Sequence, residues 1–141
     1  MSVPAFSIFS ALSEIVVTYI VLATVIGNLR GQPLRWKLLG GCLLFELCVN
    51  VMYMVYRASA VDASSDLAAG VMILFAVHGI TSLVMFVLLC LLYLVATFDF
   101  KAGQPTWFQR HRAGTWAFVV AWLFSVGTGE ALFIWRYFPL A

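Results

Sequence analysis

Charged side chains are scarce in this chain: only 10% of its 141 residues are Asp, Glu, Lys or Arg, whereas 64% are hydrophobic and the mean hydropathy is +1.03. A soluble domain of this length keeps much of its surface in water and has too little interior to cover so many apolar side chains. The scarcity of charge therefore excludes a soluble domain and indicates a membrane protein. The chain is also too short for a second folded domain beside the apolar runs.

The motifs that mark common active sites are also missing. The sequence contains no nucleophile elbow, P-loop, dinucleotide fingerprint or HExxH zinc motif. Cysteine is rare, no CxxC occurs, and Cys42, Cys48 and Cys90 all fall within apolar runs, where cysteine normally behaves as a small hydrophobe. We therefore expect a protein that is not an enzyme.

The apolar runs that are present are long and continuous. A membrane span must satisfy its backbone internally, so continuous runs predict helices, whereas a β-barrel would show alternation. We predict an all-α membrane protein of four helices, with short loops joining antiparallel neighbours. The expected spans are residues 6–26, 37–56, 67–96 and 114–138. The third exceeds the roughly 20 residues that cross a bilayer, so it should tilt or project beyond it.

Lysine and arginine gather in two of the three predicted loops. The cations, with one histidine, are Arg30, Arg35 and Lys37 in the first loop and Lys101, Arg110, His111 and Arg112 in the last. The loop between them holds Asp62 and Asp66. The positive-inside rule places both basic loops in the cytoplasm and both termini on the outer, periplasmic side of a bacterial inner membrane. This placement explains the basic residues without a nucleic-acid partner.

Each apolar run contains one ionisable residue near its middle: Glu14, Glu46, His78 and Glu130. Such a group costs roughly 2.5–3.5 kcal/mol at the bilayer centre, so it usually faces a bundle interior, a partner or a pathway. Counted from the predicted outer ends, all four lie at similar depth. Asn50 shares the helix face of Glu46, one turn further on. We predict that these five residues form an intramembrane polar cluster.

Several roles for this cluster remain open from the residues alone. The side chains can hydrogen-bond one another as structural glue, hold a small molecule, metal ion or proton, or dock onto a partner. For a metal, His78 is the best candidate ligand, because imidazole and carboxylates bind iron, zinc, manganese and copper. A haem with two histidine ligands needs a second intramembrane histidine. A haem with His78 and a methionine, or with an open position, remains an alternative.

The second half of the chain resembles a known family over roughly residues 70–137. The residues that carry the resemblance are His78 in the third run, Arg110-His111-Arg112 before the fourth, and Trp122 followed by Thr128-Gly129 within it. This pattern is similar to that of the small bacterial membrane proteins of the CtaM/YozB type, which are associated with maturation of haem-copper cytochrome oxidase. That family usually carries a further histidine at the start of its second span, where this chain has Leu34-Arg35-Trp36-Lys37.

The resemblance implies an auxiliary protein of a respiratory complex, namely an assembly or accessory factor of a haem-copper terminal oxidase. Its partners would then be other membrane protein subunits, and the polar cluster would contact haem, a metal or the client subunit. Two alternatives stand beside it. One is a permanent small subunit of a larger respiratory or photosynthetic complex. The other is a haem-, quinone- or proton-handling protein that uses His78 with a buried glutamate.

Overall fold

The computed structural model describes residues 4–59 and 69–138, and all regular structure in these ranges is helical. The helices are α1 (Ala5–Leu29), α2 (Trp36–Ser59), α3 (Ala69–Lys101), α4 (Trp107–Arg110) and α5 (Arg112–Tyr137). Four of them, α1, α2, α3 and α5, are long and apolar enough to cross a membrane. The prediction of an all-α, multi-pass membrane protein is therefore confirmed at this level.

The helix boundaries differ from the predicted spans mainly in the third. Helix α3 continues beyond Ala96 to Lys101, because the intervening residues include no glycine or proline to stop it. Lys101 was expected in a loop, but it is the last residue of this helix. The segment before the fourth span contains the single turn α4, which was not predicted as a helix. Residues 67 and 68 of the predicted third span, like Asp62 and Asp66, lie outside the described residues.

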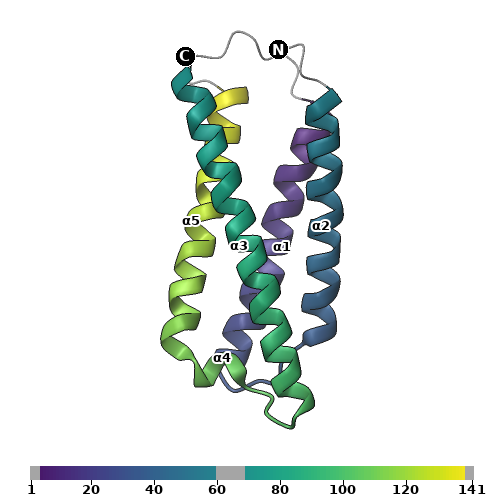
Figure 1. The fold of residues 1–141 in the computed structure, drawn as a ribbon, viewed down its shortest axis with the longest axis vertical. Helices are drawn as coiled ribbons and strands as arrows, with labels where there is room; N and C mark the ends of the chain where they lie inside the picture. The colour runs from purple at the N-terminus through teal and green to yellow at the C-terminus, as the bar shows by residue number, and fades with distance from the viewer. Residues whose placement is uncertain (1–3, 60–68, 139–141) are drawn as a thin grey trace.

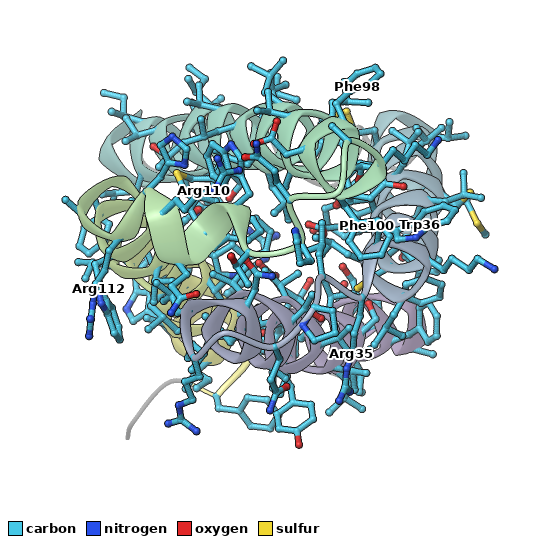
Figure 2. The ribbon with its side chains drawn as sticks, turned by 90° about the horizontal axis from the view of Figure 1, so that it is seen from below. Arg35, Trp36, Phe98, Phe100, Arg110 and Arg112 are labelled. Atoms are coloured by element: carbon cyan, nitrogen blue, oxygen red, sulfur yellow. The ribbon has the colours of Figure 1, made fainter. Side chains whose placement is uncertain are left out.

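The four long helices lie side by side, with the α1–α2 connection and α4 at the same end of the molecule (Figure 1). Helix α1 contacts α2, α4 and α5, while α3 contacts α2, α4 and α5. The seven basic-loop residues predicted to be cytoplasmic all lie in or beside the connections at the α4 end, which Figure 2 shows from below. We call the end of the bundle that contains α4 and the α1–α2 connection the α4 end.

The apolar core lies in the half of the bundle nearer α4. Each long helix contributes buried side chains, among them Val21 and Val25 of α1, Leu39 of α2, Leu89 of α3, and Phe118 and Trp122 of α5. Phe108 of α4 is 0% exposed and closes the core at that end. The outward faces carry large apolar side chains such as Tyr19 and Phe98, which are 74% and 71% exposed. Such a surface suits lipid as the surrounding solvent.

Helices α1 and α3 end in the same way because the tripeptide Gly-Gln-Pro follows both. Gly31 and Gly103 have φ of +86° and +84°, a region that favours glycine because other residues clash there. After α1, the Gly31 amide donates to the Asn28 carbonyl at 3.0 Å and the Gln32 amide to the Gly27 carbonyl at 3.0 Å. The Gly103 and Gln104 amides repeat these bonds after α3. This pair of bonds is the Schellman motif, and the following proline prevents further helix.

The two turns are joined by Asn28, which is 1% exposed at the end of α1. Its side-chain nitrogen donates to the carbonyls of Gln32 at 2.8 Å and Pro105 at 2.7 Å, and its oxygen accepts from the Phe108 amide at 3.0 Å. The Leu34 amide also donates to the Pro105 carbonyl. Asn28 therefore fixes α4, and with it Phe108, against the end of α1. This role was not predicted from the sequence: the repeated tripeptide indicates the two turns, but not the asparagine that joins them.

Candidate intramembrane polar site

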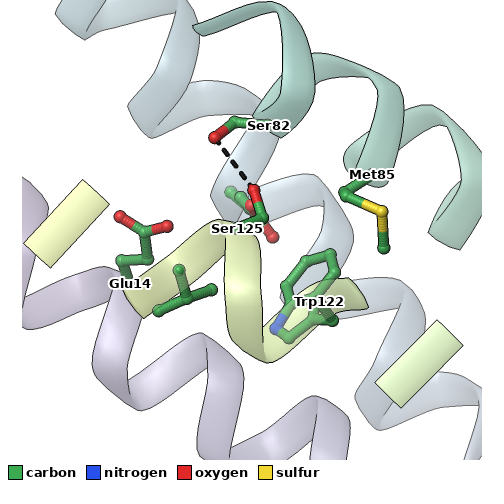
Figure 3. Close-up of a pocket in the computed structure, with 7 residues that line it drawn as sticks. Glu14, Ser82, Met85, Trp122 and Ser125 are labelled. Carbon is green, nitrogen blue, oxygen red and sulfur yellow. Dashed lines mark hydrogen bonds between the residues drawn. The ribbon is translucent and has the colours of Figure 1, made fainter. Parts of the chain in front are cut away.

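Glu14 of α1 and Glu46 of α2 line one small cavity inside the bundle. The other residues that line it are Ser82 and Met85 of α3 and Trp122, Ser125 and Val126 of α5. Figure 3 shows Glu14 and Trp122 beside the Ser82–Ser125 hydrogen bond, whose oxygens are 3.2 Å apart. The volume is about 20 Å³, which is room for about one water molecule. All four long helices thus contribute to one small, partly open polar cavity.

His78 lies against α5 and is held through both ring nitrogens. Nδ1 is 3.3 Å from the Thr128 hydroxyl, and Nε2 is 3.4 Å from the Ser82 hydroxyl. The Thr128 hydroxyl donates to the Ser125 carbonyl at 2.8 Å, so its oxygen is left to accept. A neutral imidazole that donates from Nδ1 to Thr128 and accepts at Nε2 from Ser82 satisfies all these contacts. Ser82 can then accept from Ser125, which links the imidazole to the cavity.

Gly129 lets the backbone of α5 reach the imidazole. A Cβ atom at this position would lie 2.7 Å from Cε1 and 2.8 Å from Nε2 of His78, which is far inside van der Waals contact. Small residues in a membrane helix let another helix approach closely. The structure places helix α3 there, through the His78 ring, whereas Gly127 has open space around it.

Two of the glutamates have a buried oxygen that lacks a hydrogen-bond partner within the described part of the chain. These atoms are Oε2 of Glu46 and Oε1 of Glu130. Asn50 lies one turn from Glu46 on α2, but it is exposed and does not line the cavity. Glu14 is close enough to Glu46 and Glu130 to interact with both electrostatically. A water molecule in the cavity would supply a partner for the Glu46 carboxyl.

A second polar contact lies below the cavity, on the side of the apolar core. The Trp122 indole nitrogen donates to the Thr18 hydroxyl at 3.2 Å, which joins α5 to α1. Both residues are buried. In a membrane the hydrophobic effect contributes little to the association of helices, because lipid tails are as apolar as the side chains. Hydrogen bonds between helices therefore supply part of the attraction that holds them together. Trp122 therefore separates the polar site from the core and also ties two helices together.

The described residues do not fit a metal ion or a haem at His78 in this arrangement. Within residues 4–59 and 69–138, no three His, Cys, Asp or Glu side chains gather closely enough to hold a metal. Both nitrogens of His78 already face hydroxyl groups, and the adjacent cavity has room for about one water molecule. An axial bond to haem iron would require His78 to leave Thr128 or Ser82.

The basic residues form a separate region at the α4 end, away from the polar site. Arg110 is ion-paired with Asp99, and the His111 ring stacks on Trp107 with 4.3 Å between ring centroids. Lys37 and Lys101 each place their ammonium group 5.6 Å from the centre of the Trp36 ring. Arg30, Arg35 and Arg112 are exposed. These contacts suit a membrane–water interface, where aromatic and cationic side chains meet the headgroups.

The fold and the site together define a class, a multi-pass helical membrane protein whose interior carries a polar contact among its helices. No family model, curated protein or solved structure matches the chain.

Proposed function

We propose that the chain is a non-enzymatic auxiliary membrane protein of a respiratory complex, and specifically an assembly or accessory factor of a haem-copper terminal oxidase. One observation carries the proposal. His78, Thr128 and Gly129 are among the residues that carry the family resemblance. They meet at one contact between α3 and α5, although 50 residues separate the His78–Thr128 pair in the sequence. Because the imidazole of His78 bonds the Thr128 hydroxyl and needs the space left by Gly129, these three residue types are expected to occur together.

The proposal includes an orientation. The chain forms an antiparallel bundle in a bacterial cytoplasmic membrane, with the α4 end in the cytoplasm and both termini outside. The clustering of the basic loop residues at the α4 end supports this orientation, because positively charged residues accumulate in cytoplasmic loops.

In this proposal the protein works by contact with a client subunit, and the polar site keeps the helices in register. The engagement of His78 on both nitrogens supports a structural role for the imidazole. Helix α3 offers the widest face to a membrane partner, since only 17% of its most apolar stretch is buried. The client is therefore expected to lie along α3.

Deletion of the gene tests the proposal in the host bacterium. The expected result is a loss of assembled haem-copper oxidase in reduced-minus-oxidised difference spectra, restored by the wild-type chain but not by Gly129→Leu. Cys48→Ala, at an exposed position of α2, is the matched control and should restore it. Normal oxidase spectra in the deletion strain would refute the proposal. Stable, stoichiometric purification with a finished respiratory or photosynthetic complex would instead favour a permanent subunit.

A second candidate function, proton handling, is favoured by the continuity of the polar site. The cavity joins Glu14 and Glu46 to Ser82, and Ser82 contacts His78. A water molecule between the carboxyl groups would complete a path for a proton within the polar site. Proteoliposomes with an internal pH dye test this candidate: wild-type chain should speed proton entry under an imposed potential, and Glu46→Gln should abolish the effect. Entry no faster than in protein-free vesicles would rule it out.

A further inference from the structure

An apolar groove of about 360 Å³ lies on the outer side of the α1–α2 pair. The residues that line it are Val16, Val17 and Ile20 of α1, and Lys37, Leu38, Gly41, Cys42 and Phe45 of α2. Val17 and Cys42 are buried and form its floor, where the Cys42 thiol lies 3.9 Å from the Val17 carbonyl. The rims are exposed: Val16 is 57% and Phe45 is 45% exposed. The groove is therefore open to the surrounding lipid.

Gly41 creates the depth of this groove. A Cβ atom at Gly41 would meet nothing within 4 Å, so the absent side chain leaves open space on the outward face. Leu38 and Phe45 stand three residues before and four residues after it, on the same face of α2. The backbone of Gly41 thus lies at the bottom of a notch between two apolar side chains.

A single cation stands among the lining residues, at the α4 end of the groove. Lys37 is exposed, and its ammonium group lies 5.6 Å from the centre of the Trp36 ring. Among the described residues, the one ion pair joins Arg110 to Asp99, so no carboxylate in these ranges pairs with Lys37. The rise from Lys37 to Phe45 is about 12 Å along the helix, close to the roughly 15 Å of one hydrocarbon leaflet. The cation therefore stands where the headgroup of a lipid in the groove would lie.

We propose that this groove binds one anionic phospholipid. Its acyl chain lies over Gly41 between the two helices, and its phosphate pairs with the ammonium group of Lys37. Trp36 suits this position because indole rings prefer the headgroup level. A zwitterionic lipid brings a cation of its own to the same place, so a lipid with net negative charge is preferred. The inference does not depend on the proposed function of the chain.

Native mass spectrometry of the full chain tests the proposal. The chain is purified in mild detergent and mixed with equal amounts of phosphatidylglycerol and phosphatidylcholine that carry the same acyl chains. The wild type should retain one phosphatidylglycerol in preference to phosphatidylcholine. Gly41→Leu should lose it, because the new side chain fills the groove. Gly79→Leu is the matched control, since Gly79 is an exposed glycine of α3 that also has no neighbour within 4 Å.

The headgroup contact is tested separately. Lys37→Gln should weaken phosphatidylglycerol binding about fivefold, the effect of one cation at a membrane surface, and should remove the preference over phosphatidylcholine. Arg112→Gln removes a cation from the same end of the molecule, on the side away from Trp36 (Figure 2), and should change nothing. Lys37→Gln leaves the walls of the groove intact, so it still tests the binding of an anionic lipid if Gly41→Leu expresses poorly.

Three results would overturn the proposal. The first is equal retention of both lipids by the wild type. The second is undiminished phosphatidylglycerol binding by Gly41→Leu or Lys37→Gln. The third is a dimer that is lost in Gly41→Leu, which would assign the groove to a second copy of the chain.

Discussion

His78 shows how a single polar residue is accommodated within a membrane span. Its two nitrogens contact hydroxyl groups from α3 and α5, and the hydroxyl of Thr128 is in turn bonded to the Ser125 carbonyl. The ring therefore needs no charge to satisfy its hydrogen bonds. The space for it comes from the missing side chain at Gly129. An intramembrane histidine is costly when exposed to hydrocarbon, and this arrangement removes much of that exposure.

The contact of Gly129 with His78 predicts a large difference between two neighbouring glycines. Gly129→Ala should lower the free energy of unfolding by about 1–3 kcal/mol, the usual cost of overpacking. Gly127→Ala should have little effect or raise stability slightly, because its Cβ would meet open space and alanine favours the helix. Thermal unfolding in detergent measures both. Equal melting temperatures would show that α5 does not approach His78 in this way.

The position of Glu46 predicts that its shape matters more than its charge. Glu46→Gln keeps the size of the side chain and can still hydrogen-bond a cavity water, so it should be tolerated. Glu46→Lys places a longer, charged side chain in a cavity with room for about one water molecule, beside Glu14. It should destabilise the bundle by at least about 1–3 kcal/mol, the usual cost of overpacking, because the ammonium group must also lose its hydration. Expression level and melting temperature measure the difference. Indistinguishable values for the two variants would contradict an interior position for Glu46.

At the scale of elements, α1 and α3 end through the same Gly-Gln-Pro turn, and Asn28 connects the two turns. The turns stop the helices, while the asparagine decides where α4 lies. Its three bonds reach groups on the α1–α2 turn, the α3–α4 turn and α4 itself. A single side chain thus positions the element that closes the core with Phe108.

Removal of the Asn28 side chain should therefore be costly. Asn28→Ala leaves the Gln32 carbonyl and the Phe108 amide without their partner, while the Pro105 carbonyl keeps its bond from the Leu34 amide. Each buried group left unpaired costs about 1–3 kcal/mol. Water at the bundle end will recover part of this, so we expect a loss of at least about 2 kcal/mol in the free energy of unfolding. Gln104→Ala, at an exposed position of the second turn, is the control and should be nearly neutral. A neutral Asn28→Ala variant would show that the turns are held by other contacts.

At the scale of the whole molecule, the bundle has an apolar half near α4 and a polar site beyond it. Much of this was predictable. Continuous apolar runs predicted the bounds of the four long helices to within a few residues, because length and hydropathy show whether a helix can cross lipid. One ionisable residue per run indicated an interior polar site, since charge in hydrocarbon is costly. Of the five residues of the predicted cluster, Glu14 and Glu46 line the cavity, whereas Asn50, His78 and Glu130 are not among its lining residues.

Other features were beyond the reach of pattern and periodicity. Nothing in the sequence singled out Ser82 and Ser125 as the pair that joins His78 to the cavity, because helix rotation is decided by packing across the whole bundle. Asn50 shares a helix face with Glu46, but it sits at the exposed edge of that face. The role of Asn28 depends on contacts with residues 77 and 80 positions away in the chain. Such contacts follow from how the helices meet.

The orientation of the whole molecule gives a further prediction. If the basic α4 end is cytoplasmic, alkaline phosphatase fused at either terminus should be active, because this enzyme folds only outside the cytoplasm. Fusion after Gln104, in the α3–α4 connection, should be inactive. A green fluorescent protein fused at the same points should give the opposite pattern. Activity of phosphatase at the α3–α4 connection would reverse the assignment and contradict the positive-inside argument.

The most direct test of the polar interior is a cysteine pair at positions 82 and 125, in a chain whose own three cysteines have been replaced. The two serine oxygens are 3.2 Å apart, so Ser82→Cys with Ser125→Cys should form a disulfide under mild oxidation, whereas Leu83→Cys with Ser125→Cys should not, since Leu83 is 55% exposed. Trypsin cleaves at the exposed Lys101, Arg110 and Arg112 between the two positions, so a disulfide keeps the fragments together on a non-reducing gel. We predict fragments that stay linked for the 82–125 pair and separate for the control. Fragments that separate for both pairs would contradict the interior polar contact between α3 and α5.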